Sequence, residues 1–540
     1  AILDLGACWQ RKVLLAWENE VVEAFHPVSP RSTFQVWDVT SWSKDLAVEI
    51  GGRDVINHAG AAALRLLADR VGLTSGLSRA LVRRGFVPVH DRGRVLADTA
   101  VLIADGGRVL SDLATLRDQR ELYGPVASDP TLWRTLHEIG EPQRRKIARQ
   151  RAKTREHVWS LIAKRHGQIP PSRVADGDLG KTIVIRMDAS LVIAHSDKEL
   201  AAGTYKGSWG HHPLMAWCDN TGESLALVLR KGSAGSNTVS DHIDVLEQAI
   251  TQIPARYRRD LLITLDGAGA SHGLVEHITK LNASPWRSVH YSLGWNLGAR
   301  ERAAIGRVPQ HTWDHVLDIE GKPRDLTEAG VVELTALLRE HPHGDQLANW
   351  PKDLRIVARR EKPHPGAQLS LFEDADGWRY QLLATNTAGM SAQSLEARHR
   401  PHARVEDNIR CGKQTGLGHL PSTSIDINRA WCLAATIACD LLCWLRLLCL
   451  DGPMAKAEPK TLRYRLLHTA ARIVRANANA RSAYPNPGPG QANSPPASAR
   501  RSPCPHRLDA DQRETRPRPK HPPGPVEPGA HPTRQSGPAA

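Results

Sequence analysis

The sequence predicts an α/β protein, in which a mixed β-sheet with flanking helices follows a helical region and is interrupted by a β-rich insertion. Three observations predict this class. Residues 55–161 carry apolar residues at helical spacing, residues 181–299 alternate β-patterned runs with amphipathic helices, and residues 389–475 are helical again. Because 41% of the 540 residues are hydrophobic, the chain can form a sizeable core, which excludes a wholly disordered protein.

The composition indicates which kind of partner the protein binds and in which cellular compartment we expect it. The formal charge is +14, and 54 of the 71 basic residues are arginine, which binds phosphate well. This favours a nucleic-acid partner, although GC-rich coding DNA would give the same bias. Eight cysteines without a C-x-x-C pair exclude a disulfide scaffold and a zinc ribbon. We expect a cytoplasmic protein without a secretory signal, and a buried soluble helix at residues 430–450, where Asp440 and Arg446 oppose a membrane span.

Both ends of the chain differ from its middle. We expect residues 1–40 to be an irregular leader and residues 476–540 to be a disordered, basic, proline-rich tail. Residues 481–540 hold 15 of the 36 prolines, with nine basic and four acidic residues. The tail is either a DNA-contacting arm or a segment without a role.

The helical region, residues 41–167, is predicted to bind DNA. Helices at Ala61–Gly72 and Ser75–Arg84, joined by a glycine-containing turn, form either a helix-turn-helix or a plain packed pair. The basic stretch Arg144–Arg155 lies on a predicted helix. A run of charge is usually a solvated face, but the excess here also favours phosphate contacts. The residues predicted to make them are Arg144, Arg145, Arg149 and Arg151.

From Lys181 the pattern changes to strands. The segments KTIVIRMDASLVIAHS, GHHPLMAWCDN and SLALVLRKG predict three strands, followed by a helix (Thr238–Ile253), a strand (Leu261–Leu265), a helix (Gly273–Leu281) and a strand (Arg287–Trp295). This order is typical of the RNase H-like fold. Residues 181–299 therefore form the first part of such a core. Residues 300–388 are predicted to be an insertion with a helix near Thr327–Glu340, and residues 389–475 to add the last helices.

Three acidic residues are the candidate catalytic and metal-binding groups. Asp188 lies in the first strand and Asp266 ends the fourth, so their carboxylates would meet at one edge of the sheet. Such a pair can hold two divalent ions about 3.5–4 Å apart, and oxygen ligands select Mg²⁺ or Mn²⁺. Glu406, on a later helix with Arg410 and Lys413 on nearby turns, is the third candidate. The alternative for any one of these acids is a salt-bridged carboxylate at a strand end.

Three segments of this sequence resemble a known family. They are TYKGSWGHHPLMAWCDNTGESLALVLRKGSAGSNTVSDHI (204–242), LITLDGAGASHG (262–273) and EDNIRCGKQTGLGHLPS (406–422). They are similar to the DDE transposases of bacterial insertion sequences, specifically to the Transposase DDE domain group 1 and insertion sequence family 1380. The resemblance runs from about Ser41 to Arg475. It implies that Asp188, Asp266 and Glu406 form the metal-binding triad.

Related transposases carry a Y-x₂-R-x₃-E-x₆-K signature around the glutamate. Here Glu406 and Lys413 match, whereas His399 and His402 occupy the tyrosine and arginine positions. The resemblance assigns DNA contacts to this region, and the candidates are Lys413, Arg410, His399, His402 and Arg404. Trp295, at the entrance to the insertion, is either a base-stacking residue or a core tryptophan.

With these patterns, the resemblance implies a Mg²⁺-dependent DNA transposase that cuts and rejoins the ends of an insertion sequence. The expected partners are double-stranded DNA and a second copy of the chain, in the bacterial cytoplasm at the nucleoid. No G-x₄-G-K-[ST] loop is present, so no nucleotide cofactor is expected. Two alternatives stay open, which are an RNase H-like nuclease without strand transfer and an inactive DNA-binding remnant.

Overall fold

The computed structural model describes Thr33–Val36, Leu46–Glu49 and residues 56–475, apart from residues 176, 236–237, 341–343 and 368. All of these residues belong to the first of two compact units, residues 1–480. The predicted tail, residues 476–540, lies outside the described residues, as does most of the predicted leader. The part of the leader that is described is not irregular, because Thr33–Val36 forms strand β1, which pairs with β2 (Leu46–Glu49).

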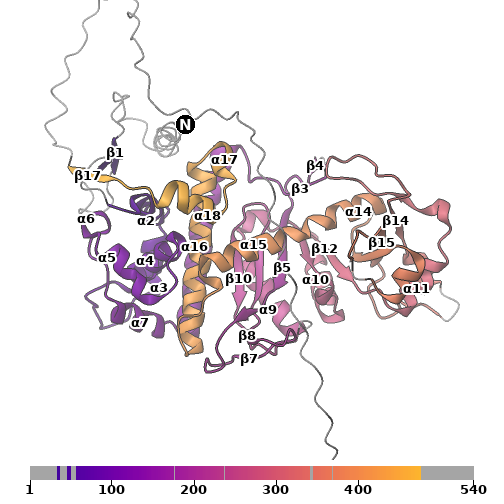
Figure 1. Ribbon diagram of the computed structural model, residues 1–540, viewed down its shortest axis with the longest axis horizontal. Coiled ribbons are helices and arrows are strands. Elements are labelled where there is room, and N and C mark those ends of the chain that lie inside the picture. Colours follow the sequence, from indigo (N-terminus) through magenta and orange to yellow (C-terminus); the bar gives the residue numbers. More distant parts are fainter. Residues whose placement is uncertain are drawn as a thin grey trace, which may run out of the picture. The chain divides into compact units, whose positions relative to one another are not determined.

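A mixed β-sheet forms the centre of this unit (Figure 1). Within the described residues its strands lie in the order β10-β9-β5-β11-β12-β16-β15-β14-β13. The first five are β10 (Ser224–Val228), β9 (Leu214–Cys218), β5 (Ile183–Ala189), β11 (Asp260–Leu265) and β12 (Ser288–Trp295). Strand β11 is parallel to both β5 and β12, whereas β9 and β10 join the sheet antiparallel. This order, with its helical crossovers, confirms the predicted RNase H-like arrangement.

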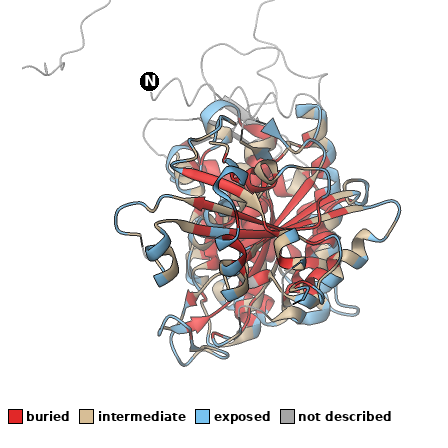
Figure 2. Cartoon of the chain, turned by 90° about the vertical axis from the view of Figure 1, so that its right-hand side faces the viewer, coloured by how far each residue is buried: buried red, intermediate tan, exposed pale blue. Residues whose placement is uncertain are grey.

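The central strands are buried because helices cover both faces of the sheet (Figure 2). Helices α9 (Val239–Gln252) and α10 (His272–Asn282) contact each other and pack on β9, β10 and β12. Helices α14 (Ala392–His399) and α15 (Arg404–Gly412) cross the sheet on the way to the C-terminal helix (Figure 1). Strands buried on both faces need continuous apolar runs, which explains sequences such as IVIRM in β5.

The insertion extends the central sheet. Its strands are β13 (Asp314–His315), β14 (Ala329–Glu333), β15 (Arg355–Glu361) and β16 (Arg379–Thr385), and its helices are α11 (Ala299–Gly306), α12 (Thr335–Arg339) and α13 (Leu371–Asp376). Strand β16 pairs antiparallel with β12, so the insertion continues the sheet from the edge of the core. The predicted helix near Thr327–Glu340 is wrong over its first half, because Val331 and Val332 pair with β15 and favour a strand.

The N-terminal helices surround the long C-terminal helix. Helix α16 (Ile425–Cys449) contacts helices from the N-terminal region, namely α2 (Ala62–Arg70), α4 (Arg92–Asp105), α7 (Asp129–His137) and α8 (Glu141–His166). By length and composition α16 could cross a membrane, but 78% of its most apolar window is buried inside the protein. The prediction of a buried helix here is therefore confirmed. In the predicted helix-turn-helix, α3 (Leu73–Leu81) follows α2 and packs between α4 and α8.

Candidate active site

The two predicted aspartates lie at the same edge of the sheet. Strands β5 and β11 are parallel, and Arg186 pairs with Thr264. Asp188 and Asp266 each follow these residues by two positions. Because side chains alternate between the faces of a strand, both carboxylates belong to the face that carries Arg186 and Thr264. Asp188 is half-buried and accepts a hydrogen bond from the backbone N–H of Ala189 (2.7 Å), while Asp266 is exposed.

The helix that carries Glu406 is fixed to this same face. A row of hydroxyl groups crosses three adjacent strands at Thr264, Ser292 and Thr385. The segment before α15 binds each of them. His402 Nδ1 lies 2.9 Å from Thr264 Oγ1, His399 Nδ1 lies 2.9 Å from Ser292 Oγ, and Arg398 Nη2 donates to Thr385 Oγ1 (3.1 Å). Since Glu406 lies in the first turn of α15, these bonds set its position beside the strand ends.

The three acids share one electrostatic environment. Burial, together with the negative charges of Asp266 and Glu406, raises the pKa of Asp188 to about 7, against the opposing charge of Lys413. Burial lowers the pKa of Lys413, and the neighbouring Lys206 adds to this effect. The acids and one lysine of the predicted site therefore lie together. The three carboxylates are nevertheless not within 4.8 Å of one another as a set, among the residues that the structure describes.

A glycine allows the chain after Asp266 to pass over the neighbouring strand. Gly294 of β12 lies two residues beyond Ser292, on the same face. A Cβ atom at this position would lie 2.5 Å from the backbone nitrogen of Gly267 and 2.9 Å from the carbonyl carbon of Asp266. Only a residue without a side chain fits there, so Gly294 helps to place the second aspartate.

His399 and His402, which the signature places among the DNA contacts, are bonded to the sheet. Both rings are half-buried and hydrogen-bonded to the sheet, as described above. Burial lowers the pKa of His399 to about 4 and that of His402 to about 3, with the charge of Arg186 acting in the same direction. The rings are therefore neutral at physiological pH and face the protein, where they anchor the segment that leads to Glu406.

The basic stretch on α8 divides into buried and exposed arginines. The prediction that Arg151 contacts DNA is wrong, because its side chain is 6% exposed and donates to Asp440 (2.7 Å) and to the carbonyl of Ser224 (3.1 Å). Arg144 is mostly covered and pairs with Glu141 and Asp426. Arg145 and Arg149 are exposed and lie one helical turn apart, with Lys146 and Lys153 exposed nearby. The sequence shows the charge of this stretch but not which side of the helix faces the core.

Two further predicted DNA contacts, Arg404 and Arg410, lie at the surface and have acidic partners. Arg404 is 44% exposed and donates to Asp219 (3.1 Å). Arg410 is 46% exposed and forms ion pairs with Asp407 (2.9 Å) and Glu458 (2.8 Å). Both arginines are at the surface of α15, beside Glu406.

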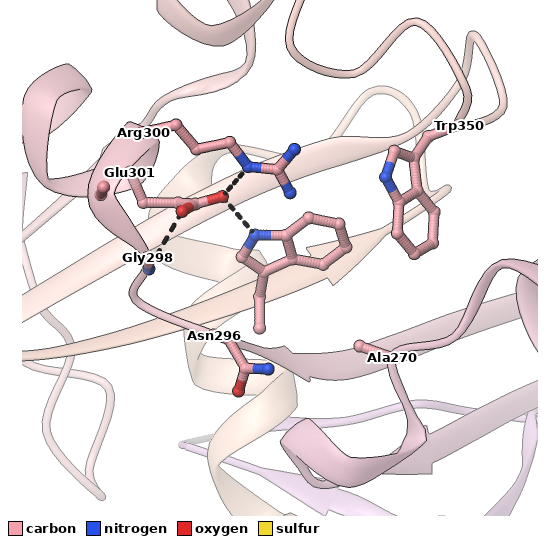
Figure 3. Close-up of a pocket in the computed structure, with 8 residues that line it drawn as sticks. Ala270, Asn296, Gly298, Arg300, Glu301 and Trp350 are labelled. Carbon is pink, nitrogen blue, oxygen red and sulfur yellow. Dashed lines mark hydrogen bonds and ion pairs between the residues drawn. The ribbon is translucent and has the colours of Figure 1, made fainter. Parts of the chain in front are cut away.

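Trp295 lines a pocket of about 450 Å³ beside the loop that follows Asp266 (Figure 3). Its Nε1 donates to Glu301 (3.0 Å), which also accepts from Arg300 (2.6 Å). Trp295 is 8% exposed, and its ring meets Trp350 edge to face, with centroids 4.8 Å apart. Trp295 is thus held in one orientation at the wall of the pocket, and Trp350 forms a second aromatic wall.

One residue of the site was not predicted from the sequence. Lys206 lies in the loop after β7 (Ala202–Gly203), close enough to Lys413 to lower its pKa. The lysine stands in the segment TYKGSWG, which resembles the family as a whole without marking this side chain. An exposed lysine in a loop carries no pattern of its own, so only the fold brings it to the acids.

Comparisons with known proteins give the family of the chain. None of the curated proteins compared with the chain matches it. Among solved structures, the chain is similar to a piggyBac transposase synaptic complex with hairpin DNA, with 12% sequence identity and a TM-score of 0.34, covering 77% of this chain and 80% of that one. The family model "Transposase DDE domain group 1" matches residues 40–492. The chain therefore belongs to the Transposase DDE domain group 1 family.

Proposed function

We propose that the protein is a DNA transposase that cuts and rejoins the ends of an insertion sequence by two-metal-ion phosphodiester hydrolysis and strand transfer. The observation that carries this proposal is the shared electrostatic site of Asp188, Asp266 and Glu406 at the carboxyl ends of two parallel strands. The family match over residues 40–492 supports it independently. As catalytic and metal-binding residues we propose these three acids.

The donor set fits hard divalent cations. All three proposed ligands offer carboxylate oxygens, which suit Mg²⁺ or Mn²⁺ better than softer metals. Burial is the main cause of the raised pKa of Asp188, and the negative charges of Asp266 and Glu406 add to it, so bound cations would stabilise the ionised carboxylates. When bound, a pair of Mg²⁺ ions about 3.5–4 Å apart would activate the attacking oxygen and stabilise the leaving oxygen.

The residues around the acids are proposed to position DNA. Lys413 and Lys206 would meet the phosphates next to the cut, while Arg404 and Arg410 would contact the backbone further along α15. Arg145 and Arg149 would add phosphate contacts on α8. Phosphate contacts of this kind fix register without reading sequence.

We propose that the pocket of Trp295 and Trp350 receives a base that leaves the duplex near the cut. Two tryptophan rings offer stacking surfaces, and Arg300 adds a cation at the rim. The partners would be the terminal inverted repeats and target DNA, held by a homodimer because two ends must be joined. The protein would act in the bacterial cytoplasm, at the nucleoid.

Neutralising each acid tests the proposal. In Asp188→Asn, Asp266→Asn and Glu406→Gln, Mg²⁺-dependent nicking of the DNA that flanks the gene should fall by orders of magnitude, while DNA binding and folding persist. The matched control is Asp407→Asn, which removes a neighbouring charge that pairs with Arg410. Wild-type nicking by the Glu406→Gln protein would refute the third ligand. Nicking without strand transfer would indicate a nuclease, and binding without nicking would indicate an inactive remnant.

A further inference from the structure

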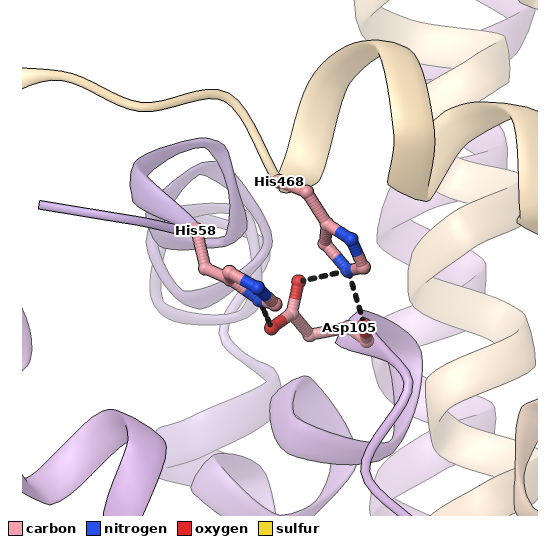
Figure 4. A group of neighbouring side chains, drawn as sticks. All are labelled: His58, Asp105 and His468. Atoms are coloured by element: carbon pink, nitrogen blue, oxygen red, sulfur yellow. Dashed lines mark hydrogen bonds and ion pairs between the residues drawn. The ribbon is translucent and has the colours of Figure 1, made fainter.

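A second cluster of potential metal ligands lies away from the acidic site. His58, Asp105 and His468 each place one ligand atom within 4.8 Å of the others, and they form the one such group among the residues that the structure describes. His58 Nδ1 lies 2.5 Å from Asp105 Oδ2, and His468 Nε2 lies 3.4 Å from Asp105 Oδ1 (Figure 4). The two imidazole rings stack with centroids 3.9 Å apart.

The buried carboxylate is incompletely satisfied. The side chain of Asp105 is 4% exposed, at the C-terminal end of α4. Its Oδ2 is engaged by His58, whereas Oδ1 is buried and, beside the 3.4 Å ion-pair contact with His468, accepts no hydrogen bond within the described part of the chain. A buried carboxylate oxygen without a donor is costly, and a cation is one of the groups that would satisfy it. The nearby guanidinium of Arg463 is bonded to the backbone carbonyls of Ala104 and Gln414.

The backbone holds the two histidines close together although they are far apart in the sequence. Ile56 and Ala471 exchange a pair of backbone hydrogen bonds (2.7 and 3.0 Å), and Ala59 N–H donates to Thr469 O (3.0 Å). The side chains of His58 and His468 are 31% and 36% exposed, so an ion could reach them from solvent. The cluster therefore combines a rigid frame, two accessible imidazoles and a buried acid.

We propose that His58, Asp105 and His468 bind a zinc ion that joins the first helices of the protein to the segment after α16. Two imidazole nitrogens and a carboxylate oxygen suit Zn²⁺, with water as the fourth ligand. In a tetrahedral site with bonds of about 2.0–2.1 Å, ligand atoms lie about 3.3 Å apart, so the existing distances require only small movements. His468 Nε2 now donates to the carbonyl of Asp105 (2.7 Å) and would exchange this bond for the metal. The site does not depend on the proposed transposase activity.

Metal binding by the full chain tests this site directly. Chelator-treated protein is titrated with Zn²⁺ by calorimetry in excess Mg²⁺, which binds oxygen ligands and competes poorly for imidazole. His468→Ala and Asp105→Asn should each lose one bound zinc per chain. The affinity for zinc should fall by more than roughly 10–100-fold, which is the usual cost of removing a residue that only hydrogen-bonds to a metal ligand. The control is His277→Ala, which breaks a simpler histidine–carboxylate pair with Glu247 (2.8 Å) and should keep that zinc.

Two further measurements keep the result independent of folding defects. Circular dichroism with chelator present identifies which variants are folded. If His468→Ala does not fold, Asp105→Asn remains as a test, because it keeps the size of the side chain. Zn²⁺ should raise the melting temperature of the wild type and of His277→Ala but not of the cluster variants. Co²⁺ in place of Zn²⁺ should give visible absorption bands of a four-coordinate site only when the cluster is intact. Equal zinc stoichiometry in wild type and cluster variants would overturn the proposal.

Discussion

His399 and His402 occupy signature positions that predict DNA contacts, but in the structure they bond to the central sheet. Each ring bonds a hydroxyl group of the central sheet, so the two histidines hold the segment that leads to Glu406. The Y-x₂-R-x₃-E-x₆-K spacing identifies this segment from the sequence. It does not indicate which way the rings face, because that depends on Thr264 and Ser292, which lie more than 100 residues earlier.

The half-buried rings of His399 and His402 predict a loss of stability in acid. In the folded protein the pKa of His399 is about 4 and that of His402 about 3, below the ordinary value of 6.5. Between these values and pH 6.5 the unfolded chain therefore binds more protons than the folded protein. Stability from the neutral rings is complete above pH 6.5 and falls as the pH drops toward 4, by at most ~1.4 kcal/mol per pH unit for each ring. Urea unfolding from pH 7 to 4 measures this slope. A His399→Gln/His402→Gln variant should show a flatter slope, and parallel slopes would contradict the assignment.

Gly294 gives a second prediction at the scale of the residue. In Gly294→Ala the new methyl group meets the backbone at Asp266 and Gly267, so the second aspartate must move. Overpacking of this kind costs about 1–3 kcal/mol, and nicking should fall by more than the unfolded fraction explains. Gly306→Ala is the control, because a Cβ atom at residue 306 would meet nothing within 4 Å among the described residues. Nicking rates normalised to the folded fraction decide the outcome, and equal rates in both variants would exclude a positioning role for Gly294.

At the scale of elements, a buried ionic network joins α8, α16 and the turn between β9 and β10. Glu223 accepts hydrogen bonds from Arg155 (2.8 Å), Trp159 (2.6 Å) and Trp444 (2.6 Å), and Asp440 accepts from Arg155 (2.6 Å). Burial alone would raise the pKa of Glu223, but Arg155 and the other donors outweigh it and lower that pKa. The inward-facing arginines of the basic stretch therefore stabilise the packing of α8 against α16 and the central sheet.

Breaking this network should destabilise the whole protein. Glu223→Gln leaves the buried guanidinium of Arg155 without one of its acids and places an amide donor near two indole N–H groups. The expected loss is about 3–5 kcal/mol in the free energy of unfolding. Glu276→Gln, which removes an exposed i,i+4 partner of Lys280, should change stability little. Urea midpoints measure both variants, and a small shift for Glu223→Gln would show that the network contributes little.

The sequence predicted the elements better than their partners. The strands of the core, the helices between them and the two aspartates at the sheet edge all follow from local periodicity and from strand order. The network of Arg155 and Asp440 could not be predicted, because these residues are 285 positions apart and only the tertiary fold joins them. The strand at Val331 was missed for a related reason, since its pairing with β15 outweighs a local helical pattern.

At the scale of the whole molecule, the exposed end of α8 is connected to the acidic site. Arg144 reaches Asp426 near the start of α16, and the neighbouring Ile425 N–H donates to Glu199 (2.8 Å). Glu199 precedes the loop that carries Lys206, which lies near Lys413. These contacts link the start of α8 to the segment that carries Lys206, which supports the proposal that the exposed arginines of α8 contact DNA.

This arrangement predicts how binding to non-specific DNA depends on salt. Affinity should fall steeply as salt rises, with a log–log slope that becomes shallower by roughly one for each phosphate-binding side chain that is removed. Arg145→Ala/Arg149→Ala should therefore flatten the slope and weaken binding to all sequences alike. Arg256→Ala/Arg259→Ala is the matched control, because these exposed arginines lie just before β11, whose opposite end leads to Asp266. Binding titrations at several salt concentrations measure the slopes. If the control flattened the slope as much as the α8 variant, the long-range charge of the chain, and not a local phosphate contact on α8, would govern the approach of DNA.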